Sequence, residues 1–234
     1  GRSPFYRRHL SGHAGARRID FEGLAAMPFT TADDLALDPL ELLCVSQADV
    51  ARVVTLHSSG TTGRPKRLYF GPEDLERTID FFHHGMATLV DSGARVLILM
   101  PGRLPGSVGD LLIQGLARLG VEGIVHGPVQ DPGATIDEIE GSDVDCLVGI
   151  PIQVLSLVRH SRGRRLPRGR IRTVLLSADY VPEPVVGELE HVWGCRVYQH
   201  YGMTEMGYGG GIDCDAHDGY HLRESDLLVE IVDP

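Results

Sequence analysis

The sequence has few of the features that mark secreted, membrane-spanning or nucleic-acid-binding proteins. Its four cysteines form no C-x-x-C pair, which suits reduced thiols better than a disulfide framework. The longest apolar runs, such as VLILM, are far too short to span a bilayer. No signal peptide is visible, although the chain opens with Gly1 rather than Met. We therefore expect no membrane span and a cytoplasmic location.

Positive charge is also scarce. The chain has 22 Lys and Arg against 32 Asp and Glu, a net charge of -10, and this argues against nucleic acid as a partner. The basic run between Arg162 and Arg172 is the exception, and we interpret it as a solvated loop rather than a binding patch. With 42% apolar and 23% charged residues, 234 residues are enough for one large globular domain or two small ones.

The order of the predicted elements indicates an α/β fold. Residues 1–50 are irregular with short helical pieces, and residues 51–234 form the predicted core, which opens with two strands around a loop and an amphipathic helix over 72–90. Apolar strands at 95–100, 121–127, 145–150, 172–178 and 196–202 then alternate with helices at 108–120, 135–141, 151–160 and 182–194. This alternation predicts a mostly parallel sheet flanked by helices. In such sheets, ligands bind beyond the carboxyl ends of the strands.

The loop HSSGTTGRPK, residues 57–66, has the composition of a polyphosphate site. Glycines let the backbone approach a ligand closely, hydroxyls add donors, and Lys66 adds a positive charge. The P-loop pattern of NTPases is absent, because Lys66 follows Pro65 and precedes Arg67. The alternative is a glycine-rich hairpin turn with incidental hydroxyls.

The stretch YGMTE, residues 201–205, follows the last predicted strand. Thr204 could donate a hydrogen bond to a phosphate oxygen, and Glu205 could bind the Mg²⁺ that accompanies a nucleoside triphosphate. Taken alone, this pentapeptide is a weak signal, and a structural cap at the exit of a strand is the favoured interpretation.

Together the two motifs resemble the adenylate-forming superfamily, which includes acyl-CoA synthetases, luciferases and adenylation domains. MPFTTADDL, YGMTEMG and CDAHDGYHLRESDLLVEIVDP, in this order around the loop, resemble its phenylacetate–CoA ligase branch. The resemblance implies an N-terminal adenylate-forming domain. It also implies ATP-dependent, AMP-forming ligation of a small carboxylic acid to coenzyme A through an acyl-adenylate. ATP or AMP, Mg²⁺ and coenzyme A are the expected cofactors and substrates, and self-association as a homodimer stays open.

The resemblance also implies roles for individual residues. The β- and γ-phosphates of ATP would be bound by Ser59, Gly60, Thr61, Thr62, Gly63 and Lys66. Tyr201 and Gly202 would flank the adenine and the acyl carboxylate, with Thr204 on the α-phosphate and Glu205 on Mg²⁺. Lys66, Thr204 and Glu205 are thus the expected catalytic residues. Ala178 and Asp179 stand in SADY, where the family carries Gly-Ala-Glu, and would line the adenine; Asp179 as a cap of the following helix is the alternative.

Two departures from the family limit these expectations. The segment PGRLPGSVG replaces the family's aromatic, glycine-rich stretch, so the acid need not be phenylacetate. The ribose-binding Arg-Thr-Gly-Asp segment and the mobile C-terminal lid domain with its lysine are absent, and we interpret the chain as a fragment of a longer protein. Adenylylation of an acceptor other than coenzyme A, or a nucleotide-binding module without turnover, are the alternative functions.

The stretch CDAHDGYH places Cys214, His217 and His221 at spacings that suit Zn²⁺. A fourth ligand would have to come from Cys146, Cys195 or His200. The alternative is an ordinary loop that turns at Gly219.

Overall fold

The computed structural model describes residues 2–13, 20–56 and 65–232. The chain divides into two compact units, Gly1–Asp74 and Leu75–Pro234. This division differs from the boundary near residue 50 that the sequence suggested, because the first two strands fall in the N-terminal unit.

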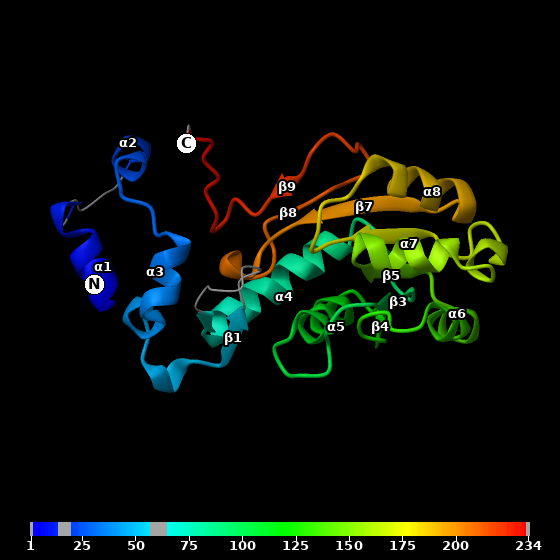
Figure 1. Ribbon diagram of the computed structural model, residues 1–234, viewed down its shortest axis with the longest axis horizontal. Helices are drawn as coiled ribbons and strands as arrows, with labels where there is room; N and C mark the ends of the chain where they lie inside the picture. The colour runs from blue at the N-terminus through cyan, green and yellow to red at the C-terminus, as the bar shows by residue number, and fades with distance from the viewer. Residues whose placement is uncertain (1, 14–19, 57–64, 233–234) are drawn as a thin grey trace. The chain divides into compact units, whose positions relative to one another are not determined.

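The N-terminal unit consists of short helices and one hairpin (Figure 1). Its helices are α1 (Pro4–His9), α2 (Phe21–Ala25) and α3 (Ala32–Leu37), with 3₁₀ turns η1 (Ser11–His13), η2 (Pro39–Leu42) and η3 (Gln47–Asp49). Thr31 caps α3 in a capping box with Asp34, which explains why a helix starts there. Strands β1 (Arg52–Leu56) and β2 (Lys66–Phe70) pair antiparallel, so the predicted phosphate loop connects the two strands of a hairpin.

The second unit contains the predicted α/β core. Its helices are α4 (Pro72–Met86, which begins in the first unit), α5 (Val108–Arg118), α6 (Pro132–Gly141), α7 (Pro151–Arg159) and α8 (Glu183–Trp193), with η4 (Gly163–Arg165) and η5 (Thr204–Met206). Its strands are β3 (Arg95–Ile98), β4 (Glu122–Val125), β5 (Cys146–Gly149), β6 (Thr173–Leu176), β7 (Arg196–Tyr201), β8 (Gly211–Ile212) and β9 (His221–Leu222).

The sheet has the order β4-β3-β5-β6-β7-β8-β9. The five strands from β4 to β7 are parallel, and β8 and β9 extend the sheet as antiparallel strands. The predicted parallel α/β sheet is therefore confirmed. The short antiparallel extension was not predicted, because two-residue strands carry no periodic signal.

Alternate strand residues face opposite sides of the sheet and build two cores. Leu97 and Leu99 pack with α6, α7 and α8 on one face, whereas Val96 and Ile98 pack with α4 and α5 on the other. Figure 1 shows α7 and α8 lying next to each other over the strands. Among the described residues, no helix is both long enough and apolar enough to cross a bilayer.

Several arginines of the basic run pair with acidic neighbours. Arg162 binds Asp137 and lies 2.6 Å from Glu140, and Arg164 lies 3.2 Å from Glu188. These pairs favour the interpretation of the run as a structural, solvated segment rather than a binding patch.

Candidate functional site

The carboxyl ends of β6 and β7 bring together two of the segments that the sequence singled out. These strands are parallel neighbours, with Leu176 paired to Gln199. Ser177 and Ala178 continue directly from β6, while Gly202, Thr204 and Glu205 follow β7. The candidate site therefore lies at the strand edge where α/β sheets bind ligands.

A pocket of about 410 Å³ opens at this edge. Its polar part includes Ser177, Thr204 and Glu205, with Ala178 and Gly202 beside them. The rest of the pocket is mainly apolar, and its aliphatic, thioether and aromatic side chains are Phe81, Phe82, Met86, Met100, Val108, Leu112, Val148, Leu175, Met203, Tyr208 and Ile212. An apolar pocket with a few convergent polar groups is the usual form of a small-molecule site.

Backbone geometry shapes the polar end of the pocket. Ala178 has φ +71°, a left-handed conformation that residues other than glycine rarely adopt, so the chain turns sharply after β6. At Gly202, a Cβ atom would lie 2.2 Å from the carbonyl oxygen of Tyr208 and 2.7 Å from Cε1 of His200. Only glycine fits there, because any side chain would meet backbone.

The segment with Thr204 and Glu205 is held by contacts from other elements. Thr78 of α4 donates a hydrogen bond from its hydroxyl to the carbonyl of Gly207 at 2.9 Å. Arg223 donates from Nη2 to the carbonyl of Met206, also at 2.9 Å. The short η5 turn thus presents Thr204 and Glu205 from an anchored segment. Their hydroxyl and carboxylate oxygens suit a phosphate group and a hard cation such as Mg²⁺, respectively.

Two predicted residues lie outside the lining of this pocket. Tyr201 is 44% exposed, and its ring centre lies 6.2 Å from that of Tyr220. The carboxylate of Asp179 accepts a hydrogen bond from the backbone N–H of Tyr180 at 2.8 Å. The alternative interpretation of Asp179 as a helix cap is wrong, because the N-cap of α8 is Pro182 and no side chain caps that end.

The predicted phosphate loop falls mostly outside the described residues. Ser59, Gly60, Thr61, Thr62 and Gly63 belong to that part of the chain, while Lys66 begins β2 in the N-terminal unit. Their assignment to the phosphates of ATP stays a prediction.

The structure does not assemble the predicted zinc ligands. Within the described residues, no three His, Cys, Asp or Glu side chains form a group that could bind a metal ion. His217 instead contacts the buried carboxylate of Asp213, with Nδ1 and Oδ2 2.8 Å apart, and His221 lies in β9 opposite Ile212. The Cys214–His217–His221 site is therefore corrected to a hydrogen-bonded turn followed by a strand.

Several pocket residues were missed by sequence reasoning. The two phenylalanines come from α4, which was predicted only as an amphipathic helix. His200 was considered only as a zinc ligand, yet it lines the pocket and burial lowers its pKa to about 4. Its place at the end of β7, two residues before Gly202, was the available signal.

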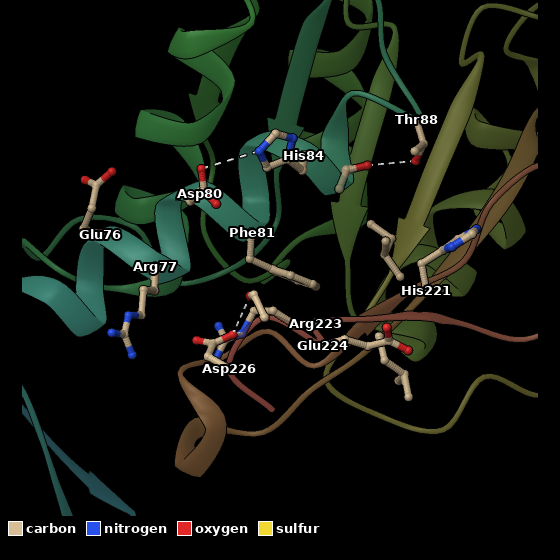
Figure 2. A pocket seen from close by; sticks show the side chains of 14 residues that line it. Glu76, Arg77, Asp80, Phe81, His84, Thr88, His221, Arg223, Glu224 and Asp226 are labelled. Atoms are coloured by element: carbon tan, nitrogen blue, oxygen red, sulfur yellow. Dashed lines mark hydrogen bonds and ion pairs between the residues drawn. The ribbon is translucent and has the colours of Figure 1, made fainter. Parts of the chain in front are cut away.

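A larger pocket of about 540 Å³ lies between α4 and the segment around β9. Figure 2 shows Phe81 projecting from α4 toward Arg223, whose guanidinium carbon lies 5.9 Å from the ring centre. Of the predicted site residues that the structure describes, only His221 lines this pocket. Its charged lining is mixed, with Glu76, Asp80, Glu224 and Asp226 beside Arg77 and Arg223. The pocket of about 410 Å³ is the one lined by the predicted nucleotide-binding residues Ala178, Gly202, Thr204 and Glu205.

Comparison with known proteins decides the family. The model of the family described as "AMP-binding enzyme" matches residues 25–225. The chain belongs to this family. Gly202, Thr204 and Glu205, which line the pocket, fall within the matched residues.

The curated relatives that the chain matches are named as CoA ligases. A feruloyl-CoA synthase from Amycolatopsis sp is 28% identical over 155 residues, which cover 66% of this chain and 30% of the relative. A long-chain-fatty-acid–CoA ligase from Bacillus subtilis (strain 168) is 23% identical over 189 residues, covering 80% of this chain and 33% of that one. The chain thus spans about a third of the length of these relatives.

The fold agrees with a solved structure of 2-hydroxyisobutyryl-CoA ligase in complex with 2-HIB-AMP and CoA. The TM-score is 0.77 at 19% identity, and the match covers 94% of this chain and 50% of that one. At this identity the likeness establishes the fold.

Proposed function

We propose that this chain is part of an ATP-dependent, AMP-forming ligase that joins a carboxylic acid to coenzyme A. The observation that carries the proposal is the 410 Å³ pocket, in which an apolar wall meets Thr204 and Glu205 at the carboxyl ends of parallel strands. An apolar wall suits the body of an organic acid, and the polar end suits phosphate oxygens and their cation. The CoA ligases among the relatives support the same reaction.

The proposed chemistry has two steps. A carboxylate oxygen of the acid attacks the α-phosphorus of ATP, a new P–O bond forms, and the bond to pyrophosphate breaks. The thiolate of coenzyme A then attacks the acyl carbon, and AMP leaves as the thioester forms. Neither step needs covalent bonding to the protein, so the residues act by positioning and electrostatics.

Each proposed residue has a physical task in this reaction. Thr204 donates a hydrogen bond to the α-phosphate, and Glu205 binds Mg²⁺, which supplies positive charge against the phosphate oxygens when it is bound. Ala178 and Gly202 provide backbone surface that a flat adenine or an acyl carboxylate can approach closely. Lys66 and the hydroxyls of residues 59–62 bind the outer phosphates. Asp179 and Tyr201 stay proposed contacts of the nucleotide, although neither lines the pocket.

The identity of the acid is a further part of the proposal. Phe81 and Phe82 give the pocket two aromatic rings, so the aromatic side chains that PGRLPGSVG lacks are supplied by α4 instead. These rings favour an aryl acid, in agreement with the resemblance to the phenylacetate–CoA ligase branch and with the relatives named feruloyl-CoA synthase.

The test uses the protein expressed from the complete gene. Acid-dependent exchange of labelled pyrophosphate into ATP measures the first step, and chromatographic detection of the acyl-CoA measures the second. We expect both with at least one acid from a panel of aryl and fatty acids. Exchange without thioester would favour a different acceptor, whereas nucleotide binding without exchange for any acid would favour a module that has lost turnover.

A further inference from the structure

His200 is a polar side chain with an unused hydrogen-bonding atom at the pocket. It lines the pocket, and its ring centre lies 5.7 Å from that of Phe81 in the apolar wall. Its Nε2 atom is buried and has no hydrogen-bond partner among the described residues. Buried polar atoms are almost always paired in native proteins, so an unpaired one at a pocket indicates a ligand contact.

The other ring nitrogen determines what Nε2 can do. Nδ1 of His200 lies 2.8 Å from the hydroxyl oxygen of Ser177. That hydroxyl has a single proton, and within the described part of the chain Nδ1 is the only acceptor in contact with it. Because burial keeps the imidazole neutral at ordinary pH, one ring nitrogen carries a proton and the other accepts. We assign Nδ1 as the acceptor of the Ser177 proton, which places the ring proton on Nε2. Nε2–H is therefore a buried hydrogen-bond donor without an acceptor among the described residues.

Gly202 lies beside this donor and lines the pocket. A Cβ atom there would lie 2.7 Å from Cε1 of His200, 3.1 Å from Nε2 and 2.2 Å from the carbonyl oxygen of Tyr208, so only glycine leaves this edge of the imidazole uncovered by a side chain. The Phe81 ring, whose centre lies 5.7 Å from that of His200, belongs to the apolar wall. The body of the acid is expected at this wall, so it is the part of the substrate nearest to His200.

We propose that His200 determines substrate specificity by donating a hydrogen bond from Nε2–H to an oxygen on the body of the acid. The site then selects acids whose apolar body carries a hydroxyl, ether or carbonyl oxygen over the matching hydrocarbon acids. Without that oxygen, the buried donor stays unpaired in the complex, which costs binding free energy. This inference rests on the proposed ligase function, since it names the substrate class of the same pocket.

The first experiment compares cinnamic acid with its 2-, 3- and 4-hydroxy derivatives in the pyrophosphate exchange assay. For at least one hydroxy acid, we expect kcat/KM to exceed that of cinnamic acid by about tenfold or more. His200→Leu should abolish this preference while leaving cinnamic acid a substrate, and His200→Gln, which keeps a donor, should restore part of it. His191→Leu makes the same change on the exposed face of α8, outside the pocket, and should leave the preference intact.

The second experiment measures the protonation of the two imidazole nitrogens of His200 directly and does not depend on enzyme activity. Long-range ¹⁵N–¹H correlation spectra of histidine-labelled protein should give His200 an unprotonated Nδ1 and a protonated Nε2. At least one of the 2-, 3- and 4-hydroxycinnamic acids, each added in turn, should shift the Nε2 resonance, and adding cinnamic acid should not. Ser177→Ala should weaken this tautomer preference.

The outcomes separate the two proposals. If no acid supports exchange, the proposed function fails, and the ring spectra still decide whether the hydrogen bond forms. If exchange occurs but His200→Leu reduces kcat/KM equally for cinnamic acid and the hydroxy acids, His200 acts on a shared part of the substrate and the inference is wrong. A protonated Nδ1 would overturn it as well, because Nε2 would then be an acceptor.

Discussion

At the scale of single residues, the proposed reaction depends on Thr204 and Glu205, which follow β7, and on Lys66 at the start of β2. We expect Glu205→Gln, Thr204→Ala and Lys66→Ala each to reduce the rate of acid-dependent exchange at least tenfold in the complete protein. That factor corresponds to a loss of about 1.4 kcal/mol of transition-state stabilisation. The reason is the same for all three, since each removes a charge or donor proposed to face the phosphates or their cation.

The control for these changes is Glu190→Gln, which neutralises an exposed carboxylate on α8 outside both pockets. Exchange rates measured at saturating acid should be unchanged in this variant. Wild-type rates in the Glu205 and Thr204 variants as well would contradict the assignment of the pocket as the site of adenylate formation.

The lowered pKa of His200 also predicts how the free energy of unfolding depends on pH. Burial lowers its pKa from 6.5 to about 4. The unfolded chain therefore binds a proton at about pH 6.5 that the folded protein does not take up until about pH 4. The stability that this group contributes is complete above pH 6.5 and is lost as the pH falls toward 4, by about 3 kcal/mol in total.

Urea unfolding measured at pH 7 and pH 4.5 tests this expectation. The groups beside His200 are the Ser177 hydroxyl, the Phe81 ring and, across the same pocket, Glu205. Because carboxylic acids in general titrate between pH 7 and pH 4.5, the comparison is made between wild type and His200→Gln, which have the same carboxylic acids. An equal loss of stability in both proteins would show that His200 does not titrate in this window.

At the scale of helices and strands, the sequence was most informative where apolar residues repeat over a long stretch. Every strand and helix predicted between residues 95 and 202 is present, because strands buried on both faces and amphipathic helices each leave a periodic signal. The β8–β9 extension has no such signal, and its pairing depends on contacts with β7 that only the folded chain provides. Local patterns predict elements, whereas they do not predict which compact unit a hairpin joins.

The packing of α8 provides a prediction at this scale. Trp193 is fully buried at the end of α8, and its indole N–H donates to the carbonyl of Gly163 at 2.9 Å. Trp193→Phe keeps an aromatic ring but removes the indole donor, which leaves that carbonyl only its 3.3 Å hydrogen bond from the backbone N–H of Leu166. We expect a loss of about 0.5–1.5 kcal/mol in the free energy of unfolding, with little effect on the pocket.

Gly187→Ala is the matched change in the same helix. Gly187 is exposed, and a Cβ there would meet nothing within 4 Å, so alanine should stabilise α8 by about 0.5–1 kcal/mol. Denaturant unfolding measures both variants. No change for Trp193→Phe would mean that the hydrogen bond to Gly163 contributes nothing to stability.

At the scale of the whole molecule, part of the candidate site could be predicted and part could not. Motifs contiguous in sequence, such as Thr204–Glu205 after β7, could be placed at the strand edge because α/β topology fixes where strand ends meet. Phe81, Phe82 and Met86 reach the pocket from α4, more than a hundred residues earlier along the chain, and their spacing is that of any core-facing helix. The acid-binding wall was therefore not predictable from the pattern, since core and pocket use the same residues.

The reactivity of the four cysteine thiols measures how much of the chain is folded, because two of them are buried. Cys44 is exposed and Cys214 is partly exposed, whereas Cys146 and Cys195 are buried, and burial raises the pKa of both buried thiols to about 12. A thiol reacts as the thiolate, so at pH 8 the two buried cysteines should be both inaccessible and protonated. Ellman's reagent should therefore modify two thiols rapidly in the native chain, and only one in Cys214→Ser.

The remaining two thiols should become reactive along the same denaturant curve that far-ultraviolet circular dichroism records, because Cys146 lies within β5 and Cys195 packs against the core under α8. The whole second unit must then open before either is reached. Rapid modification of a third thiol without denaturant would show that one edge of the sheet opens locally, and it would contradict a core that unfolds as a single unit.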